Sequence, residues 1–163
     1  MAQAQKKLRE GSHLPSEGWS VWKKAMVPEG NRGYTENRKP GQSGFIWKSI
    51  KEDINLAELC GIYEWRAIRQ YQSPRVVYVG STCTRRGNYE PLQSRILGYC
   101  RHGNHKAALI NDTLTKGYTL EVRYKRTFNE ADARQQENDL LGVYDYAWNK
   151  RCNGGINGIR YIL

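Results

Sequence analysis

Two short runs, Gly61-Ile62-Tyr63 and Arg75-Val76-Val77-Tyr78-Val79-Gly80, stand one hairpin's length apart near the middle of the chain. The second run is rich in β-branched and aromatic residues, which favour a β-strand. Between the runs, Gln72-Ser73-Pro74 supplies residues that are typical of a turn. The pattern predicts two strands, at 61–65 and 75–79, paired as an antiparallel hairpin. Cross-strand packing alone is a sufficient structural reason for the two tyrosines.

The sequence around this hairpin predicts four helices and one further strand. A short helix is expected at 49–60, Pro91 favours the start of a helix running to about residue 100, and Asn104 favours the start of another at 105–116. Apolar and polar residues alternate from Tyr118 to Lys125, which indicates a half-buried strand. Thr127-Phe128-Asn129-Glu130 has the pattern of a capping box and opens a helix to about residue 144. The expected fold class is α+β, with a small three-stranded antiparallel sheet flanked by helices.

The first part of the chain has a different composition. Residues 28–44 are dense in Gly, Pro, Asn and Ser, which cannot bury much surface. We therefore expect residues 1–44 to form a basic N-terminal arm and residues 45–163 to form the main domain. Trp19 and Trp22 are more simply explained as docked on the core than as stacking surfaces for bases, although both interpretations stay open.

The charge of the chain favours a polyanionic partner. The 163 residues carry a formal net charge of +10. Nucleic acid is favoured over a membrane because the sequence shows no long apolar or amphipathic anchor and no secretory signal. The four cysteines form no C-x-x-C pair, which favours a reduced, intracellular protein, nuclear if its source is eukaryotic and cytoplasmic otherwise. Cys100, His102 and His105 lie close together, but a zinc site there would lack a fourth ligand.

These features resemble the GIY-YIG nuclease superfamily. That family combines a GIY and a Y-I/V-G tripeptide on adjacent strands with an arginine on the following helix, a later helical glutamate and a closing asparagine. The resemblance spans roughly residues 60–154. It implies a GIY-YIG-like fold, hydrolysis of phosphodiester bonds, Mg²⁺ or Mn²⁺ as cofactor and DNA as partner. Residues 145–150 and Asn153-Gly154 are also similar to the GIY-YIG domain of plant effector-of-transcription proteins, whose cysteine-rich repeats are absent from this sequence.

Glu137 is the carboxylate that the sequence singles out. Its neighbours at helical spacing are Ala133, Leu140, Leu141 and Tyr144, which places it on the face that the last helix must bury. A buried carboxylate persists when it is paired with a cation or bound to a metal. The residues alone leave an ion pair with an arginine open, whereas the resemblance implies that Glu137 holds the divalent metal.

Three arginines compete for the position that faces the scissile phosphate. The resemblance implies an arginine on the helix after the hairpin, and Arg95 belongs to the helical pattern there. The interval from Gly80 to Arg95 is longer than usual in the family, so Arg85 and Arg86 remain rivals, and they otherwise suit contacts with the DNA backbone. His105 matches a position where some members carry a histidine beside the attacking water, and is otherwise a capping or surface residue.

The remaining candidates take their roles from the resemblance. Tyr63 is the candidate general base and Tyr78 would orient the water or the phosphate, although a free phenol titrates near pH ~10 and needs help to act as a base. Gly80 leaves room for close approach of the DNA backbone. Asn149 matches the closing asparagine and is otherwise a cap or turn residue, and Lys150 is a further candidate contact to DNA.

The sequence therefore predicts a divalent-metal-dependent endonuclease that hydrolyses DNA. The alternative is a DNA-binding transcriptional regulator that keeps the nuclease fold and cuts weakly or not at all. One chain offers one active site, so a double-strand break would require a homodimer or two successive nicks.

Overall fold

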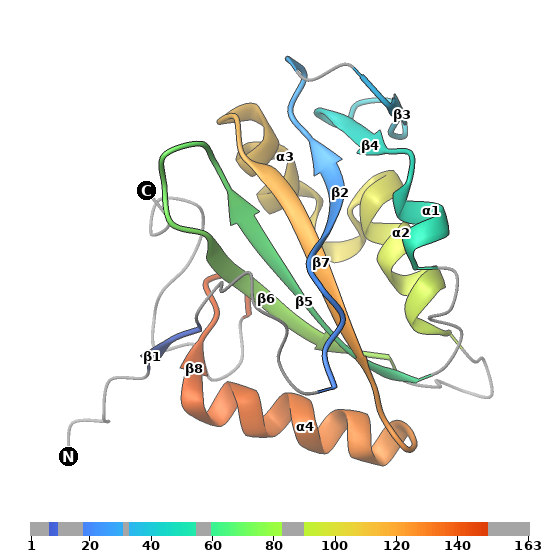
Figure 1. The fold of residues 1–163 in the computed structure, drawn as a ribbon, viewed down its shortest axis with the longest axis vertical. Helices are drawn as coiled ribbons and strands as arrows, with labels where there is room; N and C mark the ends of the chain where they lie inside the picture. Colours follow the sequence, from blue (N-terminus) through green and yellow to red (C-terminus); the bar gives the residue numbers. More distant parts are fainter. Residues whose placement is uncertain (1–6, 10–17, 31–32, 55–59, 83–89, 150–163) are drawn as a thin grey trace.

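The computed structural model describes residues 7–9, 18–30, 33–54, 60–82 and 90–149, and Figure 1 shows a twisted sheet with helices beside it. Six strands form this sheet, and every neighbouring pair is antiparallel. In spatial order the strands are β3 (Thr35–Asn37), β4 (Phe45–Trp47), β2 (Lys23–Val27), β7 (Thr119–Arg126), β5 (Gly61–Ile68) and β6 (Arg75–Ser81). A separate parallel pair joins β1 (Lys7–Leu8) to β8 (Tyr144–Asp145).

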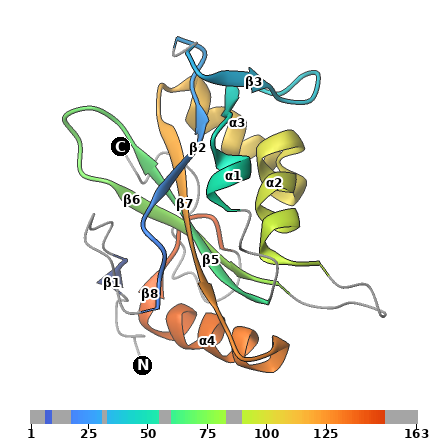
Figure 2. The same cartoon turned by 45° about the vertical axis from the view of Figure 1, so that its right-hand side comes forward.

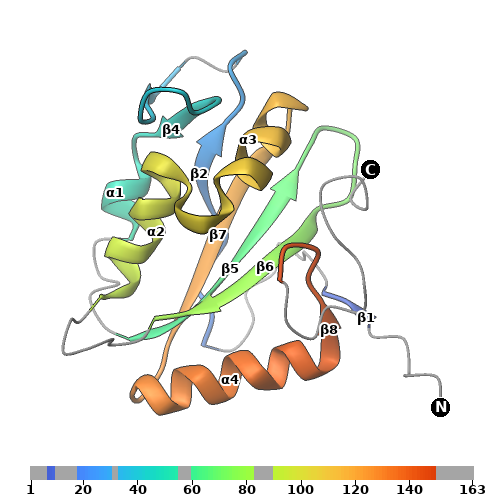
Figure 3. The ribbon, with the colours of Figure 1, turned by 180° about the vertical axis from the view of Figure 1, so that it is seen from behind.

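The helices are divided between one face and one end of the sheet. They are α1 (Ile50–Asp53), α2 (Leu92–His102), the 3₁₀ turn η1 (Asn104–Lys106), α3 (Ala107–Thr115) and α4 (Glu130–Val143). Figure 2 and Figure 3 show α1, α2 and α3 on the same side of the sheet, while α4 crosses its lower end. There α4 contacts β5 and β6. No helix in the described part of the chain is long and apolar enough to cross a membrane.

The predicted α+β class and the predicted hairpin and third strand are confirmed as β5, β6 and β7 at one side of the sheet. The sheet has six strands rather than three, because β2, β3 and β4 extend it beyond β7. Their signal in the sequence is weak. Strand β2 carries three consecutive buried residues, Ala25 to Val27, because its pairing with β7 shifts between Lys24 and Met26. A bulge of this kind removes the alternation that marks a strand.

Strands β2 and β3 belong to the part of the chain that was expected to be an arm. Arg38, just after β3, is buried and donates to the carbonyl oxygens of Cys100 (2.7 Å) and Tyr99 (3.4 Å) at the end of α2. Burial lowers the pKa of Arg38 to about 10. The division of the chain into an arm at residues 1–44 and a domain at residues 45–163 stays a prediction.

Helix boundaries also differ in detail. Within the range of the helix predicted at 49–60, the structure has the four-residue helix α1, and residues 55–59 lie outside the described part of the chain. Helix α4 begins where predicted, but its N-cap is Asn129, whose side chain accepts from the backbone N–H of Asp132 at 2.8 Å. The Asp132 carboxylate in turn accepts from the Phe128 N–H. The capping pair is therefore Asn129 and Asp132, and not Thr127 and Glu130 as predicted.

The two faces of β5 and β6 carry different chemistry. The face under α2 and α3 holds the larger apolar core, which includes Tyr63, Trp65 and Tyr78. The opposite face carries a smaller cluster with Val76 and Val79. Tyr78 lies opposite Trp65 and faces the larger core with it, and Val77 joins the same core because the pairing with β5 shifts just beyond this pair.

Candidate active site

The hydroxyl of Tyr63 lies over Gly80, its partner across the hairpin. Tyr63 pairs with Gly80 in the register of β5 and β6. A Cβ atom at position 80 would come within 2.6 Å of the Tyr63 Cζ atom. Gly80 therefore provides the space that the phenol ring fills. A similar restriction applies at Gly61, where a Cβ would approach Leu92 of α2 to 2.7 Å.

We expect Gly80→Ala to destabilise the fold by about 1–3 kcal/mol and to displace the Tyr63 ring, because the added methyl group has no free space. Thermal unfolding measures this change. Gly142→Ala is the matched control: Gly142 lies in α4 with no atom near its missing Cβ, so alanine there should stabilise the protein by about 0.5–1 kcal/mol. Equal stability of the Gly80→Ala protein and the wild type would contradict the tight packing.

Three tyrosine hydroxyls lie next to one another beneath α2. Tyr63 and Tyr99 Oη atoms are 2.9 Å apart, and the Tyr99 hydroxyl donates to Tyr78 Oη at 3.5 Å. At one end the Arg95 Nε–H donates to Tyr63 Oη at 3.4 Å. At the other end His105 Nε2 lies 3.3 Å from Tyr78 Oη. The ring centroids of the three tyrosines are 5.7–6.2 Å apart.

These side chains come from four separate elements. Tyr63 lies on β5, Tyr78 on β6, Arg95 and Tyr99 on α2, and His105 on η1. The helix places Arg95 and Tyr99 on one face because they are four residues apart. The structure thus brings together four residues that the sequence singled out, and adds Tyr99 between them.

Burial keeps the tyrosine hydroxyls protonated. Loss of solvation raises the pKa of Tyr63 above its ordinary value, and the neighbouring Tyr78 raises it further, while Arg95 acts in the opposite direction. Burial also raises the pKa of Tyr78 and of Tyr99. Tyr63 is 0% exposed, so its hydroxyl has no open path to solvent in this conformation.

Arg95 is the cation of this cluster that reaches solvent. Its side chain is 32% exposed, and Nη1 donates to the Glu90 carboxylate at 3.2 Å. Burial works to lower the pKa of Arg95, but Tyr63, Tyr99 and Glu90 outweigh this effect and raise it. The guanidinium is therefore charged at every relevant pH and can bind a phosphate.

Glu137 on α4 is partly exposed, not buried as its helical spacing predicted, and it acts electrostatically on the cluster. Its negative charge adds to burial and to Tyr99 in raising the pKa of Tyr78. Among the described residues, no three His, Cys, Asp or Glu side chains gather to hold a metal ion. A single carboxylate completed by water and phosphate oxygens is how proteins commonly bind Mg²⁺, so Glu137 fits this role.

The predicted alternative of a zinc site finds no support in the same region. Cys100 is a free, fully buried cysteine, and burial raises the pKa of its thiol to about 12. Cys100, His102 and His105 do not gather into a group of three possible metal ligands in the described part of the chain.

Asn149 binds the backbone of β6 beside the cluster. Its side-chain amide accepts from the Val79 N–H at 3.0 Å and donates to the Val79 carbonyl at 2.9 Å. Lys106 holds the preceding residue: its buried ammonium donates to the Trp148 carbonyl at 2.6 Å and lies 5.1 Å from the centre of the Tyr78 ring. Asn149 thus binds β6 at the residue after Tyr78, and Lys106 holds Trp148, the residue before Asn149.

Three predicted contacts to nucleic acid, Arg85, Arg86 and Lys150, lie outside the described residues. Of the remaining candidates, sequence reasoning missed Tyr99 and Lys106. Tyr99 could have been found from its position four residues after Arg95 on the same helix. Its spacing is equally that of a core residue, and it is 1% exposed.

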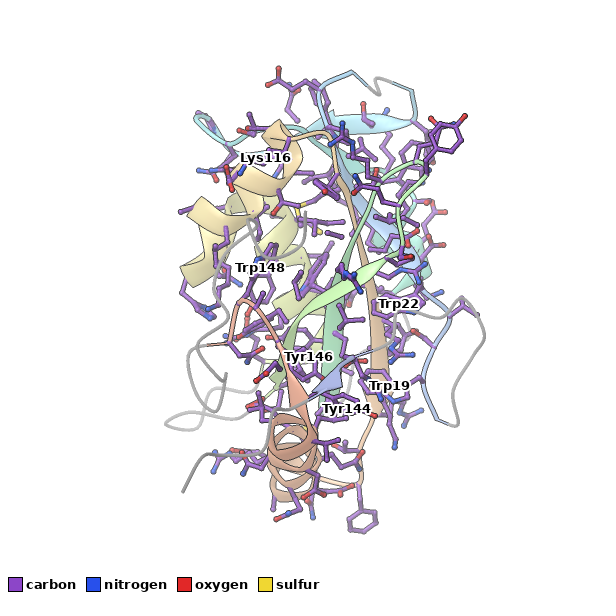
Figure 4. The ribbon with its side chains drawn as sticks, turned by 90° about the vertical axis from the view of Figure 1, so that its left-hand side faces the viewer. Trp19, Trp22, Lys116, Tyr144, Tyr146 and Trp148 are labelled. Atoms are coloured by element: carbon purple, nitrogen blue, oxygen red, sulfur yellow. The ribbon has the colours of Figure 1, made fainter. Side chains whose placement is uncertain are left out.

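The opposite face of β5 holds a charged network. Glu64 is fully buried and accepts from Arg123 (2.8 Å), Arg9 (3.1 Å) and the Tyr146 hydroxyl (2.6 Å). Arg123 also lies between the rings of Trp19 and Trp22, at 4.5 and 4.6 Å from their centres. Figure 4 shows these two tryptophans together beside β7. The two tryptophans pack on the sheet, as the sequence suggested, and the side chain that both of them contact there is Arg123.

A comparison with protein families matches most of the chain. Residues 19–159 match the family described as GIY-YIG domain-containing protein. The searches of curated proteins and of solved structures found no significant match. The matched region includes every described residue of the tyrosine cluster, and also β2, β3 and β4.

Proposed function

Because the chain belongs to the GIY-YIG domain family, whose domain points to nuclease activity in general, we propose that it is a divalent-metal-dependent endonuclease acting on DNA. The observation that carries the proposal is the convergence of Arg95, Tyr63, Tyr78 and His105, with Glu137 alongside. A cation for phosphate, a carboxylate for metal and hydroxyl groups for water are the components that phosphodiester hydrolysis requires.

Each residue has a role that follows from its surroundings. Arg95 would bind the scissile phosphate and neutralise the charge that develops there. Glu137 would hold Mg²⁺ or Mn²⁺, which supplies a water of lowered pKa and neutralises phosphate oxygens. Arg95 is the exposed partner of the Tyr63 hydroxyl, so a phosphate that draws the guanidinium outward would open this hydroxyl to the attacking water.

Asn149 and Gly80 support these groups without contacting the reacting atoms. Asn149 holds both backbone groups of Val79, between Tyr78 and Gly80. Gly80 admits the Tyr63 ring. We therefore assign both to positioning of the two tyrosines, and the predicted role of Gly80 in admitting the DNA backbone stays a prediction.

The test is conversion of supercoiled plasmid to nicked and linear forms, with Mg²⁺, Mn²⁺ or EDTA. We expect nicking with either metal ion and none with EDTA. Nicking that EDTA leaves undiminished would contradict metal dependence. Linear product that appears only after nicked product indicates successive nicks, whereas simultaneous appearance indicates two copies acting together.

A second candidate is a DNA-binding transcriptional regulator with weak or no cleavage. The observation that favours it is the enclosure of Tyr63, whose hydroxyl is both buried and protonated. The likeness of residues 145–150 to plant effector-of-transcription proteins points in the same direction. Binding of duplex DNA without nicking under any metal condition would support this candidate over the first. Either function places the protein where DNA is, in the nucleus of a eukaryotic cell or in the cytoplasm otherwise.

We expect the affinity for DNA to fall steeply with salt concentration. The chain has a net charge of +10, and basic side chains are exposed on many described elements, including Lys24, Lys39, Lys48, Arg69, Arg75, Arg101, Lys116 and Arg126. Each phosphate contact releases counterions, so log K should fall with log[salt] with a slope of about −0.9 per contact. Fluorescence anisotropy of a labelled duplex measures this slope, and a flat response would contradict a surface that binds phosphates.

A further inference from the structure

The hydrogen bonds of the tyrosine cluster form one continuous chain from Arg95 to His105. Arg95 donates to Tyr63, and Tyr99 donates to Tyr78. Either hydroxyl can be the donor in the short contact between Tyr63 and Tyr99, so Tyr63 can donate to Tyr99 while Tyr99 donates to Tyr78. Tyr78 then donates to His105 Nε2, provided that Nδ1 carries the imidazole proton. The chain begins at a fully buried hydroxyl and ends at an exposed imidazole.

We propose that Tyr99 and Tyr78 relay a proton from Tyr63 to His105 when the attacking water is deprotonated, an inference that rests on the proposed nuclease function. His105 is then the final acceptor, and Tyr99 acts through its two neighbours without contacting the substrate. The relay explains why an exposed histidine and a buried tyrosine belong to one site.

The relay resolves a conflict in the chemistry of Tyr63. Burial raises the pKa of each of the three phenols, so none of them is a phenolate near neutral pH. A neutral phenol can nevertheless accept a proton if it passes its own proton on at the same time. An imidazole ordinarily titrates near pH ~6.5, so it can accept a proton where a phenol cannot lose one.

The proposed step balances as follows. An O–H bond of the attacking water breaks and its proton joins Tyr63 Oη, while the original Tyr63 proton moves to Tyr99 Oη. The Tyr99 proton moves to Tyr78 Oη, and the Tyr78 proton forms a bond to His105 Nε2. The water oxygen forms its bond to phosphorus, the bond from phosphorus to the leaving sugar oxygen breaks, and this oxygen takes a proton from solvent. His105, now an imidazolium, returns its proton to solvent.

The charges around the chain support transfer in this direction. The Arg95 guanidinium lies 6.0 Å from the centre of the Tyr99 ring, and the Lys106 ammonium lies 5.1 Å from that of Tyr78. Both cations stabilise negative charge on the phenol oxygens during transfer. The longest link, 3.5 Å between Tyr99 and Tyr78, must shorten, as catalytic hydrogen bonds often do once substrate binds.

Two substitutions test the relay in the full-length protein, with single-turnover nicking of supercoiled plasmid as the readout. His105→Ala removes the acceptor and should slow cleavage about 10²-fold or more. Added imidazole should restore part of this rate, because the position is open to solvent. Tyr99→Phe breaks the chain while keeping the ring, and should slow cleavage similarly, with no response to imidazole. The double variant should be no slower than the slower single variant, because both changes interrupt one path.

The matched control is Tyr118→Phe. Tyr118 is a buried tyrosine of the same core, but its hydroxyl donates to Gln72 and lies outside the chain. We expect this variant to cut at the wild-type rate. Wild-type cleavage by His105→Ala or by Tyr99→Phe would overturn the relay and leave the nuclease function standing, as would losses that multiply in the double variant. Absence of cleavage by the unsubstituted protein would instead remove the nuclease function, and the relay with it.

Discussion

Glu137→Gln is expected to reduce divalent-dependent DNA cleavage about 10³-fold or more, while DNA affinity changes by no more than a few-fold. The amide keeps the shape of the side chain but removes the negative charge that holds a divalent cation. Metal-assisted stabilisation of a phosphate transition state contributes several kcal/mol, and each 1.36 kcal/mol corresponds to about tenfold in rate. Single-turnover nicking and anisotropy with the same duplex sequence measure the two effects separately.

The control for Glu137→Gln is Asp139→Asn on the same helix. Asp139 is exposed and accepts only a surface hydrogen bond from Gln135 among the contacts the structure describes for it. Its replacement also removes one negative charge, but away from the tyrosine cluster, and cleavage should stay within a factor of about two of wild type. Undiminished nicking by Glu137→Gln would reject the assignment of the metal ligand.

The hairpin could be predicted from the sequence because its strands carry strong local signals. Residues 76–79 are β-branched or aromatic, and β7 alternates apolar and polar side chains along its length. Helix α4 was predicted for a similar reason, since the capping-box pattern of Thr127-Phe128-Asn129-Glu130 indicates where it starts. These elements form the confirmed centre of the fold.

The other half of the sheet could not be predicted, because its strands are short and stabilised by distant partners. Strand β3 has three residues, none of them a large apolar side chain, and it pairs with β4 across a loop. Strand β2 owes its position to β7, which lies far along the chain. Local propensity does not reveal such pairings, since they depend on contacts made only in the folded protein.

The candidate site shows the same limit on a smaller scale. The sequence singled out Tyr63, Tyr78, Arg95 and His105 one by one, and the structure brings them within hydrogen-bonding distance of a common partner or of each other. The partner that joins them, Tyr99, has the spacing of a core residue. Its hydroxyl acquires importance only because β5, β6 and α2 bring Tyr63 and Tyr78 within hydrogen-bonding distance of it, and no local pattern encodes that geometry.

Glu64→Gln is expected to destabilise the folded protein by about 3–5 kcal/mol, the largest effect on stability that the structure predicts. Glu64 and Arg123 are almost fully enclosed, at 0% and 4% side-chain exposure, and Arg9 binds the same carboxylate at 16% exposure. Neutralising Glu64 leaves the Arg123 guanidinium buried without its counter-ion, and breaking a buried pair in this way is strongly destabilising. Urea unfolding followed by circular dichroism measures the change.

Two comparisons separate this effect from a general loss of charge. Glu130→Gln breaks the ion pair with Arg134 on the surface of α4, where Arg134 is 58% exposed, and should cost at most about 1 kcal/mol. The double variant Glu64→Leu with Arg123→Met removes both buried charges, and should be less destabilised than Glu64→Gln alone, because no unpaired guanidinium remains at position 123. Unfolding of Glu64→Gln at the same urea concentration as wild type would contradict this prediction. It would mean that water reaches Arg123 readily. The packing of Trp19 and Trp22 against this arginine would then not be a closed structure that anchors the N-terminal strands to the sheet.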